Sequence, residues 1–268
     1  MLSAALGYLA VGGVSGFFAG LLGIGGGIIL VPALVWLLAA NGYPAEYVFQ
    51  AALGTSMATI LFTAASSLRA HHAHGAVIWP ILRVFAPGVL VGAMLGSVLA
   101  RYVPVVGLTI FFCTFLLFVA LQMGLDFKPR PGRDLPAWPG QFGVATGIGV
   151  VSALVAVGGG AMTVPFLVWC NVPIRRAIGT SAAVGLPIAV GGSLGYVVNG
   201  LSIPSLPSGS LGFVFLPALL WTVLASALTA PLGAWAVARL PAQVLKRIFA
   251  VLLIGVAIYM AMRLEHSI

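Results

Sequence analysis

The sequence predicts an all-α polytopic membrane protein with two inverted repeats of about five helical segments each. Apolar residues make up 61% of the 268 residues and charged residues only 6%, which leaves too little polar surface to cover a water-soluble globule. Uncharged runs close to the ~20 residues that span a bilayer recur from end to end. A glycine-rich stretch of the first half also returns, with its flanks, in the second half.

The segments, taken in order, fall into two groups of five around a polar linker. The first group is 4–22, 28–40, 47–68, 77–100 and 105–124, and the second is 138–157, 161–172, 177–199, 211–238 and 242–263. The linker, 126–137, is rich in the prolines and glycines that mark loops, so we expect repeats over 1–125 and 138–268. Segments 28–40 and 161–172 are short for full spans, so the total is eight to ten, with some segments re-entrant or broken at glycine-rich turns.

The duplication is visible residue by residue. The first copy reads Gly25-Gly26-Gly27, Val31-Pro32 and Leu34-Val35-Trp36, and 133 positions later the second reads Gly158-Gly159-Gly160, Val164-Pro165 and Leu167-Val168-Trp169. Downstream, Gly54-Thr55-Ser56 matches Gly179-Thr180-Ser181 at a spacing of 125, and Gly96 and Pro104 match Gly233 and Pro241 at a spacing of 137. Small insertions and deletions in the loops explain the drift in spacing.

The positive charges test the orientation of the two copies. An odd number of crossings per repeat turns the second copy upside down relative to the first, a plan found in many transporters. With ten crossings, ten of the twelve Lys and Arg residues fall on one side. If each glycine break instead joins two half-helices into one crossing, the charges divide six against six. We therefore expect inverted repeats with both termini outside.

The remaining charge and cysteine pattern narrows the class of protein. The net charge of +8 is scattered over short connections instead of forming a basic face, so we expect membrane anchors and no nucleic-acid partner. Cys113 and Cys170 lie in apolar runs without CxxC spacing, so no disulfide, metal site or cofactor is predicted. The N-terminus lacks the basic region of a cleavable signal, and the first segment is expected to stay in the membrane.

The glycine triplets are the first candidate site. Such a run is tolerated in hydrocarbon only where it is packed in protein or lines a watery cavity. The helix that follows presents unpaired N–H groups and a partial positive charge, which suit an oxyanion. We therefore predict that a small anionic substrate binds Gly25, Gly26, Gly27, Gly158, Gly159 and Gly160, while Pro32 and Pro165 shape the early turns of the short helices. The alternative is close packing of small residues between helices.

Hydroxyl and charged side chains complete the candidate set. Thr55, Ser56, Thr180 and Ser181 lie near mid-membrane and can donate to an anion, or bond back to their own helix. Residues at segment ends are predicted to serve gating or electrostatic attraction, with membrane-interface anchoring as the alternative; they are Arg69, His74, Arg175, Arg176 and Asn199. No charged residue falls deep in a segment, which argues against a cation pump.

An enzymatic function is not predicted. Gly13-Val14-Ser15-Gly16 fits the GxSG string of rhomboid intramembrane serine proteases, in which a serine on one helix meets a histidine on another. Here no histidine occurs in the interior of a later segment, and the second copy has no equivalent serine. Gly23 to Gly27 resembles a phosphate loop only superficially, because no Lys-Ser or Lys-Thr follows it.

The chain resembles the TauE/SafE family, also called the sulfite exporter or TSUP family, over essentially its whole length. Each repeat of that family carries a glycine-rich stretch followed by proline and, downstream, a Gly-Thr-Ser segment; the second copy here departs from the pattern with Ala156 where the first has Gly23. The resemblance implies secondary transport of sulfur-containing oxyanions, such as sulfite or organosulfonates, exported across a bacterial inner membrane. We expect alternating access between the repeats, with an anion channel or a non-transporting membrane scaffold as alternatives.

Overall fold

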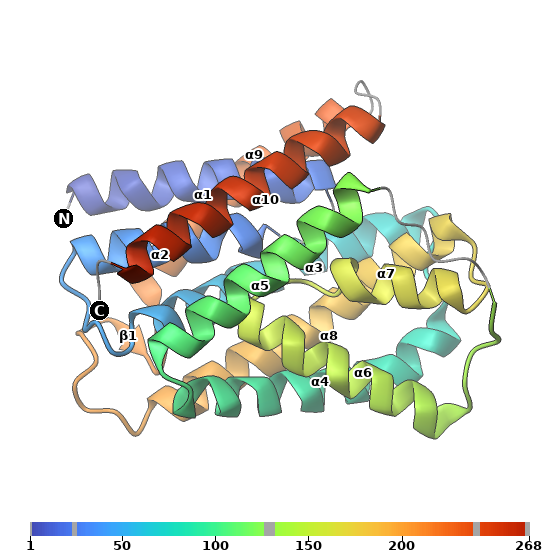
Figure 1. Ribbon diagram of the computed structural model, residues 1–268, viewed down its shortest axis with the longest axis horizontal. Coiled ribbons are helices and arrows are strands. Elements are labelled where there is room, and N and C mark those ends of the chain that lie inside the picture. Colours follow the sequence, from blue (N-terminus) through green and yellow to red (C-terminus); the bar gives the residue numbers. More distant parts are fainter. Residues whose placement is uncertain (1, 23–25, 126–131, 238–241, 266–268) are drawn as a thin grey trace.

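The protein folds into a bundle of long helices, as the sequence predicts (Figure 1). The computed structural model describes residues 2–22, 26–125, 132–237 and 242–265. Within these ranges the first half contains α1 (Leu2–Leu22), α2 (Gly27–Ala40), α3 (Val48–Ala73), α4 (Trp79–Tyr102) and α5 (Val105–Gly124). The second half contains α6 (Trp138–Val155), α7 (Gly160–Trp169), α8 (Ile174–Gly200), strands β1 (Ser210–Leu211) and β2 (Val214–Phe215), α9 (Leu216–Val237) and α10 (Ala242–Glu265).

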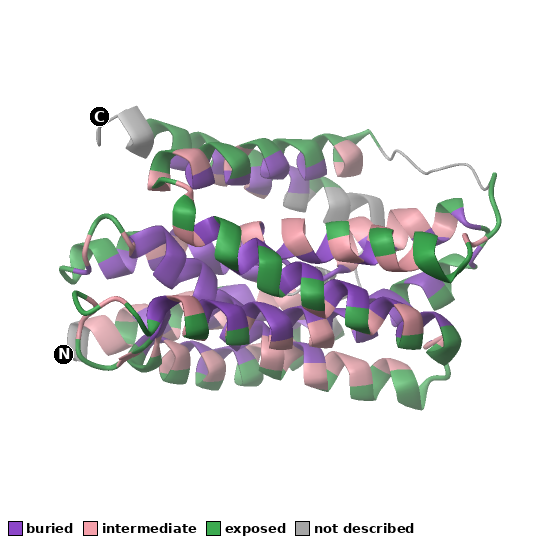
Figure 2. Cartoon of the chain, turned by 90° about the horizontal axis from the view of Figure 1, so that it is seen from below, coloured by how far each residue is buried: buried purple, intermediate pink, exposed green. Residues whose placement is uncertain are grey.

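The helices confirm an integral membrane protein of the all-α class. Six of those described, α3, α4, α5, α6, α8 and α9, are long and apolar enough to cross a membrane. Large apolar side chains stand exposed on the outer helices, as on α5 (Phe118 and Leu121) and on α9 (Leu220 and Leu228), where lipid rather than water suits them. Figure 2 shows the buried residues gathered on the inner helices and the exposed ones on the outer faces.

Some element boundaries differ from the prediction. The segment predicted over 211–238 begins as a β-hairpin, and its helix starts only at Leu216, because Gly209 (φ 91°) and Gly212 (φ 56°) take up backbone conformations that a helix excludes. Helix α3 continues to Ala73, past the predicted end at 68. Helix α7 ends at Trp169 instead of 172, since Asn171 (φ 61°) closes its last turn.

Each short helix turns back at its glycine break instead of continuing the helix that precedes it. Gly7 of α1 lies against the Leu37 side chain of α2, and Gly26 lies against Ser15 and Ala19, so α1 and α2 are antiparallel. In the second half, the Trp169 carbonyl at the end of α7 accepts the N–H of Arg133 just before α6 begins. The alternative in which a glycine break joins two half-helices into a single crossing is therefore wrong.

The two short helices are too short to cross the hydrocarbon core of a membrane. Helix α2 has 14 residues and α7 has 10, which correspond to about 21 Å and 15 Å, less than the ~30 Å of a hydrocarbon core. The start of α1 and the end of α10 lie at one end of the bundle, and the start of α6 lies at the other (Figure 1).

Helices α3 and α8 form the centre, flanked by two pairs that make equivalent contacts. Helix α1 packs along α9, and α6 packs along α4. Gly16 of α1 meets the backbone of Ser226 in α9, while Gly149 of α6, 133 positions later, meets the backbone of Val89 in α4. In each case the first helix of one half therefore packs against the fourth helix of the other half. In the centre of the bundle, all residues of α3 from 51 to 60 are buried.

Candidate functional site

A cavity of about 370 Å³ lies beside the second glycine break. The end of α1, the middle of α9, the second half of α3, the first half of α8 and the glycine triplet 158–160 line it. Gly185 of α8 faces the triplet, and Ser181 of the same helix lines the cavity as well, while Ala70 and His71 of α3 line it nearer the end of the bundle. The cavity thus joins the buried helix break to the end of α3.

The inner part of the cavity combines backbone N–H groups with a hydroxyl. The first N–H groups of a helix have no partner within that helix, and α7 begins at Gly160. A Cβ on Gly185 would lie 3.9 Å from the Gly159 nitrogen, so backbone faces backbone here. Ser181 is 1% exposed, and its Oγ has no hydrogen-bond partner among the described residues. These groups can solvate a small anion without a buried cation.

The rest of the described lining is mostly apolar, but it carries four further hydroxyls and no acidic group. Thr63, Ser66, Ser67 and Ser226 contribute hydroxyls, and His71 is the only titratable side chain among the described residues that line the cavity. Sequence reasoning missed the four hydroxyl residues. The signal was present, because Thr63, Ser67 and His71 recur every four positions and share one face of α3.

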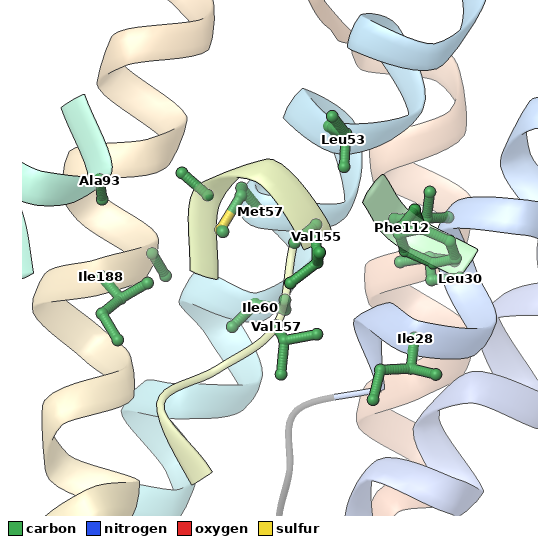
Figure 3. Packing of buried hydrophobic residues seen from close by; sticks show 14 of the residues in the cluster. Ile28, Leu30, Leu53, Met57, Ile60, Ala93, Phe112, Val155, Val157 and Ile188 are labelled. Carbon is green, nitrogen blue, oxygen red and sulfur yellow. The ribbon is translucent and has the colours of Figure 1, made fainter. Parts of the chain in front are cut away.

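The described part of the first glycine break, Gly26 and Gly27, is packed instead of open. Gly26 takes a left-handed conformation (φ 45°), and Gly27 lies directly against the Ala156 carbonyl of the second break. Figure 3 shows Ile28, Ile60 and Val157, from α2, α3 and the second break, in the cluster around this contact. The two breaks therefore touch, but Gly26 and Gly27 are absent from the described lining of the cavity. Gly25 lies outside the described residues.

The Gly-Thr pairs hold the chain that enters the fourth helix of the other half. Thr55 Oγ1 accepts the Phe215 N–H at 3.0 Å, and Thr180 Oγ1 accepts the Ile78 N–H at 2.9 Å. Phe215 immediately precedes α9, and Ile78 immediately precedes α4. Two equivalent hydrogen bonds therefore connect the two halves. An anion-binding role for the two threonines stays a prediction.

The glycine of each pair permits that approach. A Cβ on Gly54 would lie 2.7 Å from the Phe213 carbonyl oxygen, and one on Gly179 would lie 2.6 Å from that of Ala76. The serine that follows each pair has no such bond. Ser56 and Ser181 are both buried, and neither Oγ has a hydrogen-bond partner within the described ranges.

We expect Thr55→Val or Thr180→Val to lower the free energy of unfolding by about 1–3 kcal/mol, because a buried backbone N–H loses its acceptor while side-chain volume is kept. The measurement is the thermal unfolding midpoint of purified protein in detergent. Thr114→Val is the matched control, since Thr114 is exposed on α5 and its hydroxyl bonds only to Ile110 O of the same helix. Equal midpoints for all three variants would show that the two cross-links contribute nothing.

The predicted gating residues separate into two groups. Arg69, His74, Arg175 and Arg176 are exposed where α3 ends and α8 begins, which is the end that the cavity approaches. Asn199 lies near the opposite end of α8, and its Nδ2 donates to Gly195 O at 2.7 Å and to Ser97 Oγ at 3.2 Å.

The other residues singled out from the sequence have ordinary surroundings. Pro32 and Pro165 lie in the second turn of α2 and α7. The Ser15 hydroxyl donates to Gly12 O of its own helix at 3.4 Å. Within the described ranges, no three His, Cys, Asp or Glu side chains gather into a metal-binding group.

Comparison with known proteins identifies the family. The family model described as sulfite exporter TauE/SafE matches residues 8–260. A probable membrane transporter protein of Haemophilus influenzae is 38% identical over 258 residues, which cover 95% of this chain and 97% of that protein. A probable membrane transporter protein of Xylella fastidiosa is 29% identical over 94% of this chain and 93% of its own. No solved structure matches the chain. The protein therefore belongs to the TauE/SafE sulfite exporter family of membrane transporters.

Proposed function

We propose that this transporter exports sulfur-containing oxyanions, such as sulfite or organosulfonates, and binds them at the inner part of the cavity. The observation that carries the proposal is that the α7 N-terminus and the buried, unpartnered Ser181 hydroxyl line the same cavity. An anion that leaves water must exchange its hydration for protein hydrogen bonds. Backbone N–H and hydroxyl groups provide these bonds, and the described lining contains no carboxylate to repel the anion.

The choice of sulfur chemistry rests on the family description. Sulfite and sulfonates carry several oxygens around one centre, and oxygens of this kind accept charge-assisted hydrogen bonds from N–H and O–H donors. His71 and the hydroxyls of Thr63, Ser66 and Ser67 would line the path between this site and the end of α3.

Transport would proceed by alternating access between two inverted repeats, residues 1–125 and 138–268. The equivalent helix contacts of the two halves support this mechanism, because a molecule of two similar halves can open to either side by exchanging their roles. The excess of Lys and Arg at the end of α3 and the start of α8 favours a cytoplasmic location for that end. Both termini would then lie outside a bacterial inner membrane, and the cavity would load from the cytoplasm.

Binding to purified protein and flux into proteoliposomes test this function directly. The ligands are sulfite, sulfate, sulfoacetate and taurine. We expect saturable uptake and counterflow with at least one of them, since a carrier must return through the same states. Uptake without saturation or counterflow would point to a channel, and the absence of any flux or binding would contradict the proposed substrate class.

Removal of the Ser181 hydroxyl is expected to weaken binding of the transported anion by about 10- to 100-fold, because a hydrogen bond to a charged group contributes about 1.5–3 kcal/mol. The Kd of Ser181→Ala for that anion is the measurement. Ser202→Ala removes a hydroxyl from the exposed turn after α8 and should keep the wild-type Kd. Equal Kd values for the two variants would remove Ser181 from the site.

A further inference from the structure

The cavity has a closed counterpart in the other half of the molecule. Ser66 of α3 and Ala227 of α9 line the cavity. Their repeat equivalents, Gly191 of α8 and Leu90 of α4, are in direct contact, since a Cβ on Gly191 would lie 3.1 Å from the Leu90 Cα. The same asymmetry holds along the whole elements, because α4 packs extensively on α8 while α9 contacts α3 much less. The facing surfaces of α3 and α9 are therefore apart, whereas the equivalent surfaces of α8 and α4 are in contact.

The closed counterpart contains hydroxyls that its packing does not explain. Ser56 is the equivalent of the cavity residue Ser181, and Ser152 is the equivalent of the cavity residue Ala19. Ser56 is 0% exposed and Ser152 is 1% exposed. Neither Oγ has a hydrogen-bond partner in the part of the chain that the structure describes. A buried hydroxyl without a partner is costly, so its presence calls for a second state in which it is solvated or bound to a ligand.

Tyr196 closes the outer part of this region. It is the equivalent of His71, which lines the cavity near the end of α3. Tyr196 is fully buried, and its hydroxyl donates to Ala153 O of α6 at 3.0 Å. The equivalent of Ala153 is Gly20, which lines the cavity as His71 does. The hydrogen bond therefore joins two positions whose equivalents, His71 and Gly20, both line the open cavity.

We propose that Ser56, Ser152, Gly192 and Tyr196 line the second half of the substrate path, which is closed here, and that the hydrogen bond from Tyr196 to Ala153 is its gate. In the exchanged state the α4/α6 pair separates from α8, and the α1/α9 pair closes on α3. The inference rests on the proposed transport by alternating access, but it concerns the path and not the identity of the anion.

Thiol labelling tests the gate without any substrate. The chain carries Cys113→Ala and Cys170→Ala, together with Ser152→Cys, and the probe is a small membrane-impermeant methanethiosulfonate. Tyr196→Phe removes one buried hydrogen bond that favours the closed form, so the labelling rate of Ser152→Cys should rise about fivefold. In the same background, Ser67→Cys reports the open cavity that Ser67 lines, and it should keep nearly its full labelling rate, because the cavity-open state stays the main one.

Tyr43→Phe is the matched control. It also removes one tyrosine hydroxyl, which lies 3.4 Å from Ser210 Oγ outside the proposed path, and it should leave both labelling rates unchanged. Equal labelling of Ser152→Cys in the Tyr43→Phe and Tyr196→Phe chains would overturn the gate.

A cross-link tests the same exchange independently of Tyr196. Ser66→Cys paired with Ala227→Cys should form a disulfide under a mild oxidant, because the two positions approach in the exchanged state as Gly191 and Leu90 do here. Failure to cross-link, while each single cysteine still labels, would contradict the exchange. If labelling and cross-linking behave as expected but none of the four tested anions moves, the proposed substrate fails and the gate stands.

Discussion

Gly27→Ala is expected to abolish the folded transporter. The Gly27 Cα lies against the Ala156 carbonyl, and the added methyl would also come within 2.9 Å of Ile60 Cδ1. A flexible side chain can turn away from such a methyl, but the backbone of the second break cannot. Overpacking of this kind costs about 3 kcal/mol or more, a large part of the stability of an ordinary protein. We expect little protein in the membrane and a thermal unfolding midpoint in detergent far below that of the wild type.

Gly147→Ala is the control for this substitution. Gly147 lies on the exposed face of α6, where an added Cβ meets nothing within 4 Å. Alanine is the better helix former, so the control should match or slightly exceed the wild-type midpoint. A Gly27→Ala protein that unfolds at the same temperature as the control would show that the two breaks are not packed against each other.

Much of the fold could be predicted from the sequence because hydropathy and duplication are local signals. A run of apolar residues indicates a membrane helix wherever it packs, and the repeated triplets located both breaks. The glycine breaks alone do not give the direction of α2 and α7, because the chain could continue or turn back; it was the one-sided distribution of Lys and Arg that favoured a chain that turns back. The contacts of Gly26 with Ser15 and Ala19 settle that question only in three dimensions.

The site was harder to predict because its partners are distant in the chain. Thr55 and Thr180 looked equivalent to Ser56 and Ser181 as hydroxyl donors, yet each threonine accepts a backbone N–H from more than 100 residues away. The sequence also treats the two glycine triplets alike, whereas among their described glycines only those of the second triplet line the cavity. A duplicated sequence predicts two equivalent sites, but a single conformation can hold one half open and the other closed.

That difference between the triplets decides which glycine can test the site. Leucine at Gly26 would be forced into a left-handed backbone (φ 45°), with its Cβ 2.9 Å from the Ser15 carbonyl, so it would damage the fold together with any site. Gly159 instead has helical backbone (φ −48°). Its Cβ would meet the ends of side chains, Thr163 Oγ1 at 3.0 Å and Ile188 Cδ1 at 3.1 Å, which can give way.

Gly159→Leu is therefore expected to keep the fold and to block transport. The leucine side chain would occupy the inner part of the cavity and cover the N–H groups at the start of α7. Loss of two hydrogen bonds to a charged ligand corresponds to about 3 kcal/mol, so anion flux into proteoliposomes should fall about 100-fold or more. Gly143→Leu places the same side chain on the exposed face of α6, where nothing lies within 4 Å of the new Cβ, and should transport normally. Wild-type flux in a folded Gly159→Leu protein would move the anion site away from the second glycine break.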